Sequence, residues 1–326
     1  MLSRRTFLAG TSASLLAAPA LAQSYPTHTI RIIAGFPPGG GIDISARLIA
    51  DPLKDALGQT VIVENRTGAA GMLAANTVAK APPDGHTLLM ATSGEIAIAE
   101  HLYKDKMTYD PATELTPVAL IGVVPCVVVV ADATPVHNPQ ELIAYAKAHA
   151  GKLSFSSSGV GNPQQLAGEL MNTMAGTNVL HVPYRGAAPA VTDVATGAVT
   201  MSFTSLAAAL PLLKAGKLRA VAVTSKDRMP QLPDVAPLSE GAPGLAGYEL
   251  LNWFGLFVTG GTPQPIVDRL NAIVNNALKA PAIADKLVPQ GIVPRPMNAA
   301  DFKKFVASES EKFGKIIVQA NIKVAN

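Results

Sequence analysis

The stretch IRIIAGFPPGGGIDISARL, residues 30–48, contains the pattern from which the fold of the whole chain is predicted. Its first four residues alternate as in a β-strand, and a turn rich in proline and glycine follows at residues 36–41. Apolar residues then recur at helical spacing from Ile42 onwards. A strand that passes through a glycine loop into a helix is the building unit of α/β sheets. The sequence therefore predicts an α/β protein.

The glycine loop also suggests an anion site. The first backbone N–H groups of a helix have no partner within the helix, and the helix dipole places positive charge behind them. Gly39 and Gly40 carry no Cβ, so the oxygens of a ligand can approach these amides closely. The alternative is a tight turn without a ligand, because the motif is neither G-x-G-x-x-G nor G-x-x-x-x-G-K-[ST].

Residues 1–22 have the pattern of an export signal. Arg4 and Arg5 precede a short apolar run rich in alanine, and the run ends at the small-x-small cleavage site of residues 20–22. The run is too short for a stable membrane anchor, although an N-terminal tether is the alternative. Paired arginines followed by x-Phe-Leu match a twin-arginine (Tat) signal. We expect Tat export, cleavage after Ala22 and a periplasmic mature chain.

The composition of the remaining 304 residues restricts the class of protein. Two of the 26 basic residues and none of the 23 acidic residues lie in the signal, which leaves 24 basic against 23 acidic residues. This near-neutral balance indicates no nucleic-acid partner. The length predicts two lobes, and a core with 48% hydrophobic but only 5% aromatic residues suits sheets covered by helices. Cys126 is the only cysteine, and its apolar neighbours favour a buried, inert thiol.

The mature chain predicts two sets of alternating strands and helices. The first set includes a strand at 87–91 that ends in Thr92 and Ser93, and the second includes a strand at 153–156 that opens into a loop of small residues. Ligands bind at such carboxyl ends in open α/β sheets. Further predictions are strands over 199–203 and 218–223, a crossing segment over 118–131 and a closing helix over 299–319. The expected lobes are residues 23–124 plus 248–326, and residues 125–247.

Motifs for catalysis or metal binding are missing from the sequence. It contains no G-x-S-x-G, H-E-x-x-H or C-x-x-C, and its six histidines lack metal-ligand spacing. Asp43 is either a general base or a partner of its own helix start. Arg185 either holds a carboxylate or is a solvated turn residue. Tyr184 and Phe36 are either walls of a small-molecule cleft or ordinary packing residues.

Six segments together carry a resemblance to a known family. They are residues 35–43, 64–71, 79–85, 182–186, 215–220 and 253–256, in family order. The chain resembles the Bug family of periplasmic solute-binding proteins, the TctC-type receptors of tripartite tricarboxylate transporters. The resemblance implies a two-lobed periplasmic binding protein fold, type II-like, in which each lobe is a sheet flanked by helices. It also implies a hinge of crossing segments and a carboxylate ligand in the cleft between the lobes.

Two positions depart from the family pattern. Thr204 stands where the family commonly has Asp, and Gln165 stands where many members have His. A threonine offers a neutral donor and acceptor in place of a charge, so a plain carboxylic acid is favoured over an amino acid. In the family, the carboxylates are held mainly by loop amides, hydroxyl groups and ordered water.

The predicted function is that of a monomeric periplasmic receptor without enzymatic activity, cofactor or metal. It captures a small di- or tricarboxylic or aromatic acid and delivers it to a tripartite tricarboxylate transporter-type permease. A ligand sensor for a membrane signalling partner and a Tat-exported enzyme are the alternatives. The predicted ligand-binding residues are Phe36, Gly39, Gly40, Asp43, Thr92, Ser93, Ser157, Ser158, Gly161, Asn162, Tyr184, Arg185 and Thr204.

Overall fold

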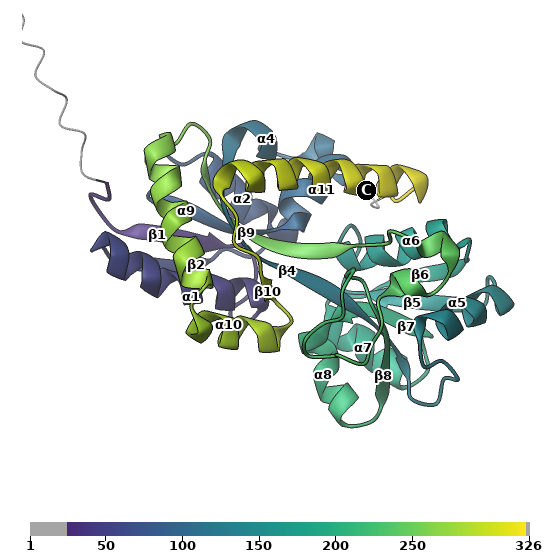
Figure 1. The fold of residues 1–326 in the computed structure, drawn as a ribbon. Helices are drawn as coiled ribbons and strands as arrows, with labels where there is room; N and C mark the ends of the chain where they lie inside the picture. The colour runs from purple at the N-terminus through teal and green to yellow at the C-terminus, as the bar shows by residue number, and fades with distance from the viewer. Residues whose placement is uncertain (1–24, 324–326) are drawn as a thin grey trace, which may run out of the picture.

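The computed structural model describes residues 25–323, and the predicted export signal lies outside this range. Two α/β lobes lie side by side, and the long strand β4 (Leu115–Ala131) runs from one into the other (Figure 1). The predicted two-lobed α/β fold, in which each lobe is a sheet flanked by helices, is therefore confirmed. No helix among the described residues is both long and apolar enough to span a membrane.

The strands of the first lobe combine a parallel and an antiparallel part. They are β1 (Ile30–Ala34), β2 (Val61–Asn65), β3 (Thr87–Thr92), β9 (Leu251–Thr259), β10 (Val293–Pro294) and the first half of β4. β1 is parallel to both β2 and β3, whereas β9 is antiparallel to β3 and to β4. The prediction of parallel sheets covered by helices thus holds for the outer strands, and the strands nearest the second lobe are antiparallel.

The second lobe repeats this plan. Its strands are β5 (Leu153–Ser157), β6 (Val179–Pro183), β7 (Met201–Ser205), β8 (Leu218–Val223) and the second half of β4. β5 is parallel to β6 and β7, while β7 and β8 are antiparallel to β4. The partners of β4 change between Pro125, which pairs with β9, and Cys126, which pairs with β7. The crossing between lobes therefore lies at these two residues.

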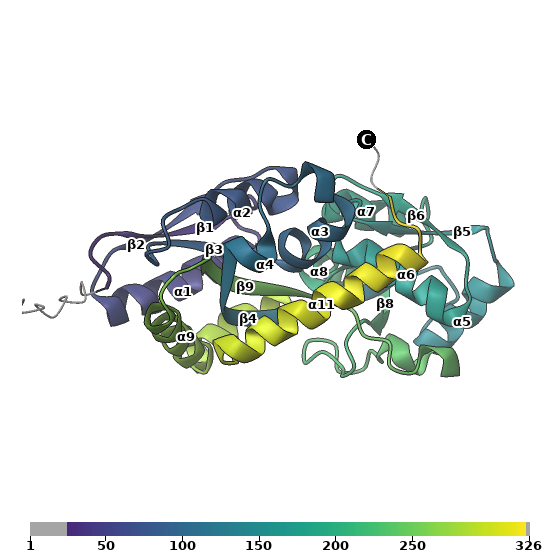
Figure 2. The ribbon, with the colours of Figure 1, turned by 90° about the horizontal axis from the view of Figure 1, so that it is seen from above.

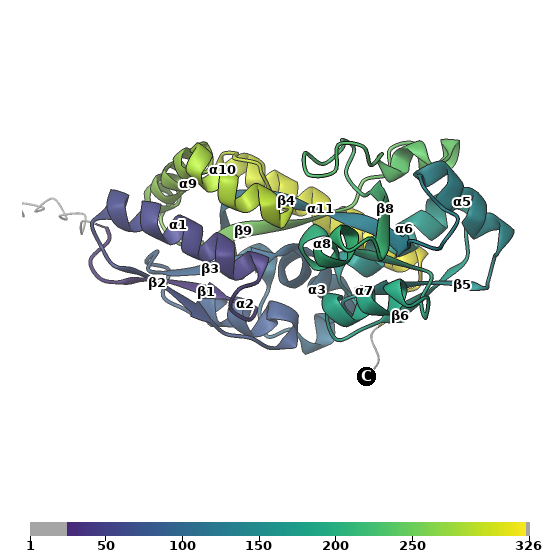
Figure 3. The ribbon, with the colours of Figure 1, turned by 90° about the horizontal axis from the view of Figure 1, so that it is seen from below.

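Helices cover both faces of each sheet (Figures 1 and 3). In the first lobe they are α1 (Gly41–Leu57), α2 (Met72–Ala79), α3 (Ala99–Leu102), α4 (Pro111–Glu114), α9 (Gln264–Leu278), α10 (Pro281–Leu287) and α11 (Ala299–Gln319). In the second they are α5 (Pro139–Ala148), α6 (Pro163–Ala175), α7 (Ala187–Ala195) and α8 (Leu206–Lys214). Short helical turns occur at Ala69–Gly71, Gly94–Ile98 (η2, a π-helical turn), Lys104–Lys106, Leu238–Glu240, Pro243–Leu245 and Val288–Gln290.

The closing helix α11 connects the two lobes. Figure 2 shows that it runs diagonally from the first lobe to α6 of the second. Its residue Phe302 is fully buried and packs edge-on against Trp253 of β9 at 6.0 Å between ring centroids. Gly255 makes this approach possible, because a Cβ there would lie 2.4 Å from Phe302 Cζ. The same hydrophobic core continues to Phe155 in the second lobe, so one core is shared between the lobes.

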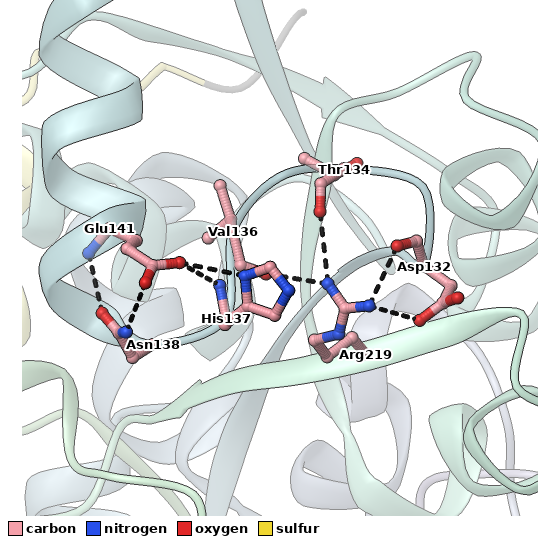
Figure 4. Close-up of polar contacts among 7 residues, drawn as sticks. All are labelled: Asp132, Thr134, Val136, His137, Asn138, Glu141 and Arg219. Carbon is pink, nitrogen blue, oxygen red and sulfur yellow. Dashed lines mark hydrogen bonds and ion pairs between the residues drawn. The ribbon is translucent and has the colours of Figure 1, made fainter.

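The turn that leaves β4 in the second lobe is fixed by one arginine (Figure 4). Arg219 of β8 donates hydrogen bonds to the carbonyl oxygens of Thr134 and Val136, each at 3.3 Å, and to Asp132 Oδ1 at 2.6 Å. Helix α5 then starts at a capped residue, because Asn138 Oδ1 accepts from the Glu141 amide at 2.8 Å. Together these bonds hold the β4–α5 connection on the outer end of the lobe.

We predict that Phe302→Ala lowers the free energy of unfolding by about 3–5 kcal/mol, because it removes a ring from the core shared by both lobes and leaves a cavity. Equilibrium denaturation in guanidinium chloride measures the change. The control is Val318→Ala on the same helix, whose side chain is 80% exposed and whose loss should stay within about 0.5 kcal/mol. Equal stability of the two variants would contradict the bridging role of α11.

Candidate functional site

A cleft of about 690 Å³ lies between the lobes. From the first lobe it is lined by Phe36, Pro37, Pro38, Gly40, Gly41, Ile42, Ala70, Met72, Thr92, Gly94, Ala99, Tyr103, Asn252 and Phe254. From the crossing of β4 it is lined by Val124, Pro125 and Cys126, and from the second lobe by Ser158, Gly159, Val160, Gly161, Asn162, Pro163, Gln164, Ala187 and Ser205. The cleft therefore opens where β4 changes partners.

The amino-terminal end of α1 lies at the wall of this cleft. Gly40 precedes the helix in an extended conformation, and no side chain caps the helix start. Gly40, Gly41 and Ile42 all line the cleft. Because the first N–H groups of a helix have no intrahelical acceptor, these amides are left to a ligand or to water. The first-lobe loop thus has unpaired helix-start amides of the kind that suit an anionic oxygen.

Asp43 positions the glycine loop from behind. Its buried carboxylate accepts hydrogen bonds from the Gly39 amide at 2.9 Å, from Asn65 Nδ2 at 3.0 Å and from Arg47 Nε at 3.0 Å. Burial raises the pKa of Asp43, but the hydrogen bonds from Arg47, Gly39 and Asn65 lower it by more, so the net shift is downward. Asn65 Nδ2 also donates to the Phe36 carbonyl oxygen at 2.9 Å. An ionised Asp43 therefore holds the loop in shape.

The second-lobe loop differs because its own side chains occupy its amides. Gln164 Oε1 accepts from the Ser158 amide at 2.7 Å, and Gln165 Oε1 accepts from the Gly161 amide at 2.8 Å. Asn162 caps α6 through the Gln165 amide and donates from Nδ2 to Ser158 Oγ at 2.9 Å. A ligand can reach the Ser158 amide only by displacing the Gln164 side chain. The first-lobe loop is therefore the more open of the two.

Six of the thirteen predicted residues line the cleft, namely Phe36, Gly40, Thr92, Ser158, Gly161 and Asn162. The structure does not bring the other seven to its surface: Gly39, Asp43, Ser93, Ser157, Tyr184, Arg185 and Thr204. Several of these seven side chains form hydrogen bonds with other residues or are exposed to solvent. Ser93 Oγ donates to Asn252 Oδ1 at 2.8 Å, Tyr184 Oη donates to Asp193 Oδ2 at 2.5 Å, and Arg185 is exposed.

Thr204 and Ser157 are buried within strands. The strand predicted at 199–203 is observed two residues later, at Met201–Ser205, because its register is set by pairing with β4. Thr204 therefore lies inside β7, opposite Val127, and its hydroxyl has no hydrogen-bond partner among the described residues. Ser157 Oγ lies 2.7 Å from His181 Nε2, and burial lowers the pKa of that histidine to about 4.

Several lining residues were not found from the sequence. Pro125 and Cys126 on β4, and Asn252 and Phe254 on β9, reach the cleft because β9 pairs with β4 up to the point where β4 crosses between the lobes. Burial raises the pKa of the Cys126 thiol to about 12, so the thiol stays protonated near neutral pH. Tyr103 was also missed. These residues reach the cleft through tertiary structure, since nothing in the local sequence of a strand marks the position where it changes partners.

The lobes already touch across the cleft. A Cβ on Gly161 of the second lobe would lie 2.8 Å from Leu102 Cδ1 and 3.5 Å from the hydroxyl oxygen of Tyr103, both from the first lobe. Glycine is favoured there, because its φ of +71° strains other residues and a Cβ would push the Leu102 side chain aside. The loop at Gly161 and the segment after α3 therefore form one wall of the cleft together.

The cleft wall carries no charged side chain among the residues that the structure describes. Its polar groups are the side chains of Thr92, Tyr103, Ser158, Asn162, Gln164, Ser205 and Asn252, together with loop amides. The rest is apolar, with Phe36 and Phe254 as the largest rings. An anion in this cleft is held by dipoles and hydroxyl groups, and a ligand ammonium group finds no carboxylate partner.

Three side chains outside the cleft lie close enough together to be considered as a metal site. The nearest ligand atoms of His28, Asp84 and His86 lie within 4.8 Å of one another. The two imidazole rings, however, are stacked with centroids 3.7 Å apart and planes 8° apart, so their nitrogen lone pairs lie in two nearly parallel planes and do not converge on one point. His86 Nε2 also accepts from the Thr27 amide at 3.0 Å. This arrangement fits a hydrogen-bonded stack better than a metal centre.

Comparison with known proteins places this chain in a family. Residues 45–322 match the family described as the tripartite tricarboxylate transporter family receptor. The chain is 38% identical to a UPF0065 protein from the tcbD-tcbE intergenic region of Pseudomonas sp. (strain P51), over 98% of this chain and 95% of that protein. It is 32% identical to BugT of Bordetella pertussis (strain Tohama I), over 95% of this chain and 94% of BugT.

Solved structures of periplasmic binding proteins are also similar to this chain. A protein of R. palustris solved with adipate has a TM-score of 0.80 and 36% identity, covering 92% of this chain and 99% of that one. MatC from Rhodopseudomonas palustris with bound malate has a TM-score of 0.74 and 33% identity, covering 90% and 100%. The periplasmic binding protein BugD has a TM-score of 0.75 and 31% identity, covering 92% and 99%. The chain belongs to the Bug, or TctC-type, family of solute-binding receptors, as its six sequence segments predicted.

Proposed function

We propose that this receptor captures a small carboxylate in the periplasm and delivers it to a tripartite tricarboxylate transporter-type permease. The observation that carries the proposal is the uncapped start of α1, with Gly40, Gly41 and Ile42 on the wall of a cleft between two lobes. Amides at a helix start suit a carboxylate. The related structures solved with adipate and malate support this ligand class, and the family match supports the permease partner.

The chemistry of the wall narrows the ligand. A carboxylic acid with an apolar body fits the aromatic and proline side chains around Phe36 and Phe254, and its carboxylate meets amides and hydroxyls. An amino acid would leave its ammonium group without a counter-charge. A tricarboxylate would bring three negative charges into a wall without a cation. We therefore propose a dicarboxylic or aromatic acid as the ligand.

Ligand capture involves movement of two lobes, residues 23–124 plus 248–326 and residues 125–247. The proposed hinge is the crossing at Pro125 and Cys126. There the Cys126 amide donates to Thr224 Oγ1 at 2.8 Å, and the Leu250 amide donates to the Thr224 carbonyl oxygen at 3.0 Å, so Thr224 connects β4 to the returning chain. Closure is favoured because the ligand binds the closed form more tightly than the open form.

The first prediction concerns ligand binding by the mature chain. We expect adipate, malate or benzoate to raise the melting temperature and citrate and glutamate to have little effect. A ligand at about 100 times its dissociation constant stabilises the folded state by about 2.7 kcal/mol. Thermal-shift measurements provide the screen, and the fluorescence of the single tryptophan, Trp253, next to lining residues Asn252 and Phe254, provides a second readout. No response to any carboxylate would contradict the proposed function.

The second prediction concerns the first-lobe loop. Gly40→Val should weaken carboxylate binding by more than about tenfold, equivalent to about 1.4 kcal/mol, because the branched side chain covers the amides of the α1 start. The extended backbone of Gly40 accepts valine, since a Cβ would meet only the Pro37 carbonyl oxygen at 3.6 Å. Thr192→Val on the exposed face of α7 is the control. Calorimetric affinities that are equal for both variants would place the anion elsewhere.

The third prediction concerns export, which we propose follows the Tat route with cleavage after Ala22. Replacing Arg4 and Arg5 by lysines should retain the precursor in the cytoplasm, because the Tat receptor reads the arginine pair. Cell fractionation and the mass of the periplasmic product measure the effect. Unchanged export of the double-lysine protein would indicate another route.

A further inference from the structure

The carboxyl group of Glu95 is buried directly beneath the cleft. The proposed ligand capture does not use it. Glu95, in the π-helical turn η2, is 0% exposed. Its Oε1 accepts from the Thr92 amide at 2.8 Å, and its Oε2 is hydrogen-bonded to Thr92 Oγ1. Thr92 itself lines the cleft, and its Oγ1 accepts from the Gly94 amide at 2.9 Å. Glu95 is therefore hydrogen-bonded to the hydroxyl group of a residue that lines the cleft.

The carboxyl group is enclosed tightly. Gly71, with φ +90°, lies against it so closely that a Cβ there would stand 2.9 Å from the Glu95 carboxyl carbon. The residues on either side of Gly71, Ala70 and Met72, line the cleft. No ion pair joins Glu95 to a lysine, arginine or histidine in the part of the chain that the structure describes. Burial raises the pKa of Glu95 to about 7, while the hydrogen bonds from Thr92 act in the opposite direction.

The titratable groups on the elements around η2 bind to other partners. Tyr109 donates its hydroxyl to the main-chain oxygen of Glu95 and not to its carboxyl group. On α3, Glu100 and His101 both contact Ser310 of α11, and on α11 Glu309 pairs with Lys312 at 2.5 Å. β3 and α2 carry no charged residue facing Glu95, since Thr87–Thr92 and Met72–Ala79 contain none. Glu95 is thus the group whose protonation acts on Thr92.

The hydrogen-bonding capacity of a hydroxyl, one donor and two acceptor lone pairs, determines what Thr92 offers to the cleft. When Glu95 is ionised, it takes the hydroxyl hydrogen of Thr92, and the Gly94 amide fills one lone pair. Only a lone pair remains, and it repels a carboxylate oxygen. When Glu95 is protonated, its O–H and the Gly94 amide fill both lone pairs of Thr92 Oγ1. The hydroxyl hydrogen is then free to donate to a carboxylate.

Resting on the proposed carboxylate-binding function, we propose that Glu95 is a positioning residue that couples ligand capture to uptake of one proton. The proton passes from solvent to Glu95 Oε2, and the hydroxyl hydrogen of Thr92 turns from Glu95 to the ligand. No covalent bond of the ligand changes. Protonation also removes a negative charge from beneath an otherwise uncharged cleft, which favours the same bound state.

The experiment is isothermal titration calorimetry of the mature protein with adipate, malate and benzoate at pH 6 and pH 8. Carboxyl groups of ordinary pKa are largely ionised across this range. Affinity should be highest below the pKa of Glu95, about 7, and should fall about tenfold between pH 6 and pH 8, because the competent fraction falls by that factor. At pH 8 the binding enthalpy should also depend on the ionisation enthalpy of the buffer, which reports proton uptake.

Glu95→Gln is the decisive variant. Its amide oxygen accepts from the Thr92 amide and its amide nitrogen donates to Thr92 Oγ1, so it imitates the protonated carboxyl group at every pH. It should bind as tightly at pH 8 as the wild type binds at pH 6, without proton uptake. Thr92→Val should bind weakly at both pH values. In infrared difference spectra, a protonated-carboxyl band present at pH 6 in the wild type should be missing in Glu95→Gln.

Two results would overturn the role of Glu95 and leave the receptor function intact: carboxylate binding by the wild type with no pH dependence, or the same pH dependence in Glu95→Gln. A different result, no carboxylate bound at either pH, would overturn the receptor function and this inference with it.

Discussion

Most features of this protein follow from the sharing of one strand by two sheets. β4 must satisfy its backbone hydrogen bonds with β9 along its first half and with β7 and β8 along its second. At the change of partners, Pro125 has no N–H to offer, and Thr224 supplies the acceptor for the Cys126 amide. The sheets separate at this point, and the cleft lies there. Its position is therefore a consequence of strand connectivity.

The sequence predicted the local elements well where periodicity alone decides them. The strand over 218–223 and the closing helix over 299–319 are observed with the predicted bounds. The strand predicted at 199–203 is shifted by two residues, because pairing between β7 and β4 sets its position. The same shift puts Thr204 inside the sheet. A register between strands far apart in sequence is a tertiary property, and hydrophobic pattern does not encode it.

Only the part of the cleft that is formed by local sequence patterns could be predicted. Gly40, Ser158 and Asn162 stand in loops that follow strands, and this local pattern marks a ligand edge in α/β folds. Asn252 and Phe254 lie within a strand and reach the cleft only through the crossing. Nor does the sequence reveal which loop amides are already occupied. Asp43 takes the Gly39 amide and Gln164 takes the Ser158 amide, and both choices depend on side-chain geometry.

This occupation of amides gives the two loops different tasks. The start of α1 offers amides without side-chain partners, so a carboxylate gains new hydrogen bonds there. At Ser158 a ligand oxygen would replace the oxygen of Gln164, and exchange of one acceptor for another changes the free energy little. In the proposed function, the second lobe therefore contributes mainly by covering apolar ligand surface and excluding water. We therefore propose that the first lobe anchors the carboxylate and that the second lobe selects the ligand by shape, since the cleft lining has no charged side chain.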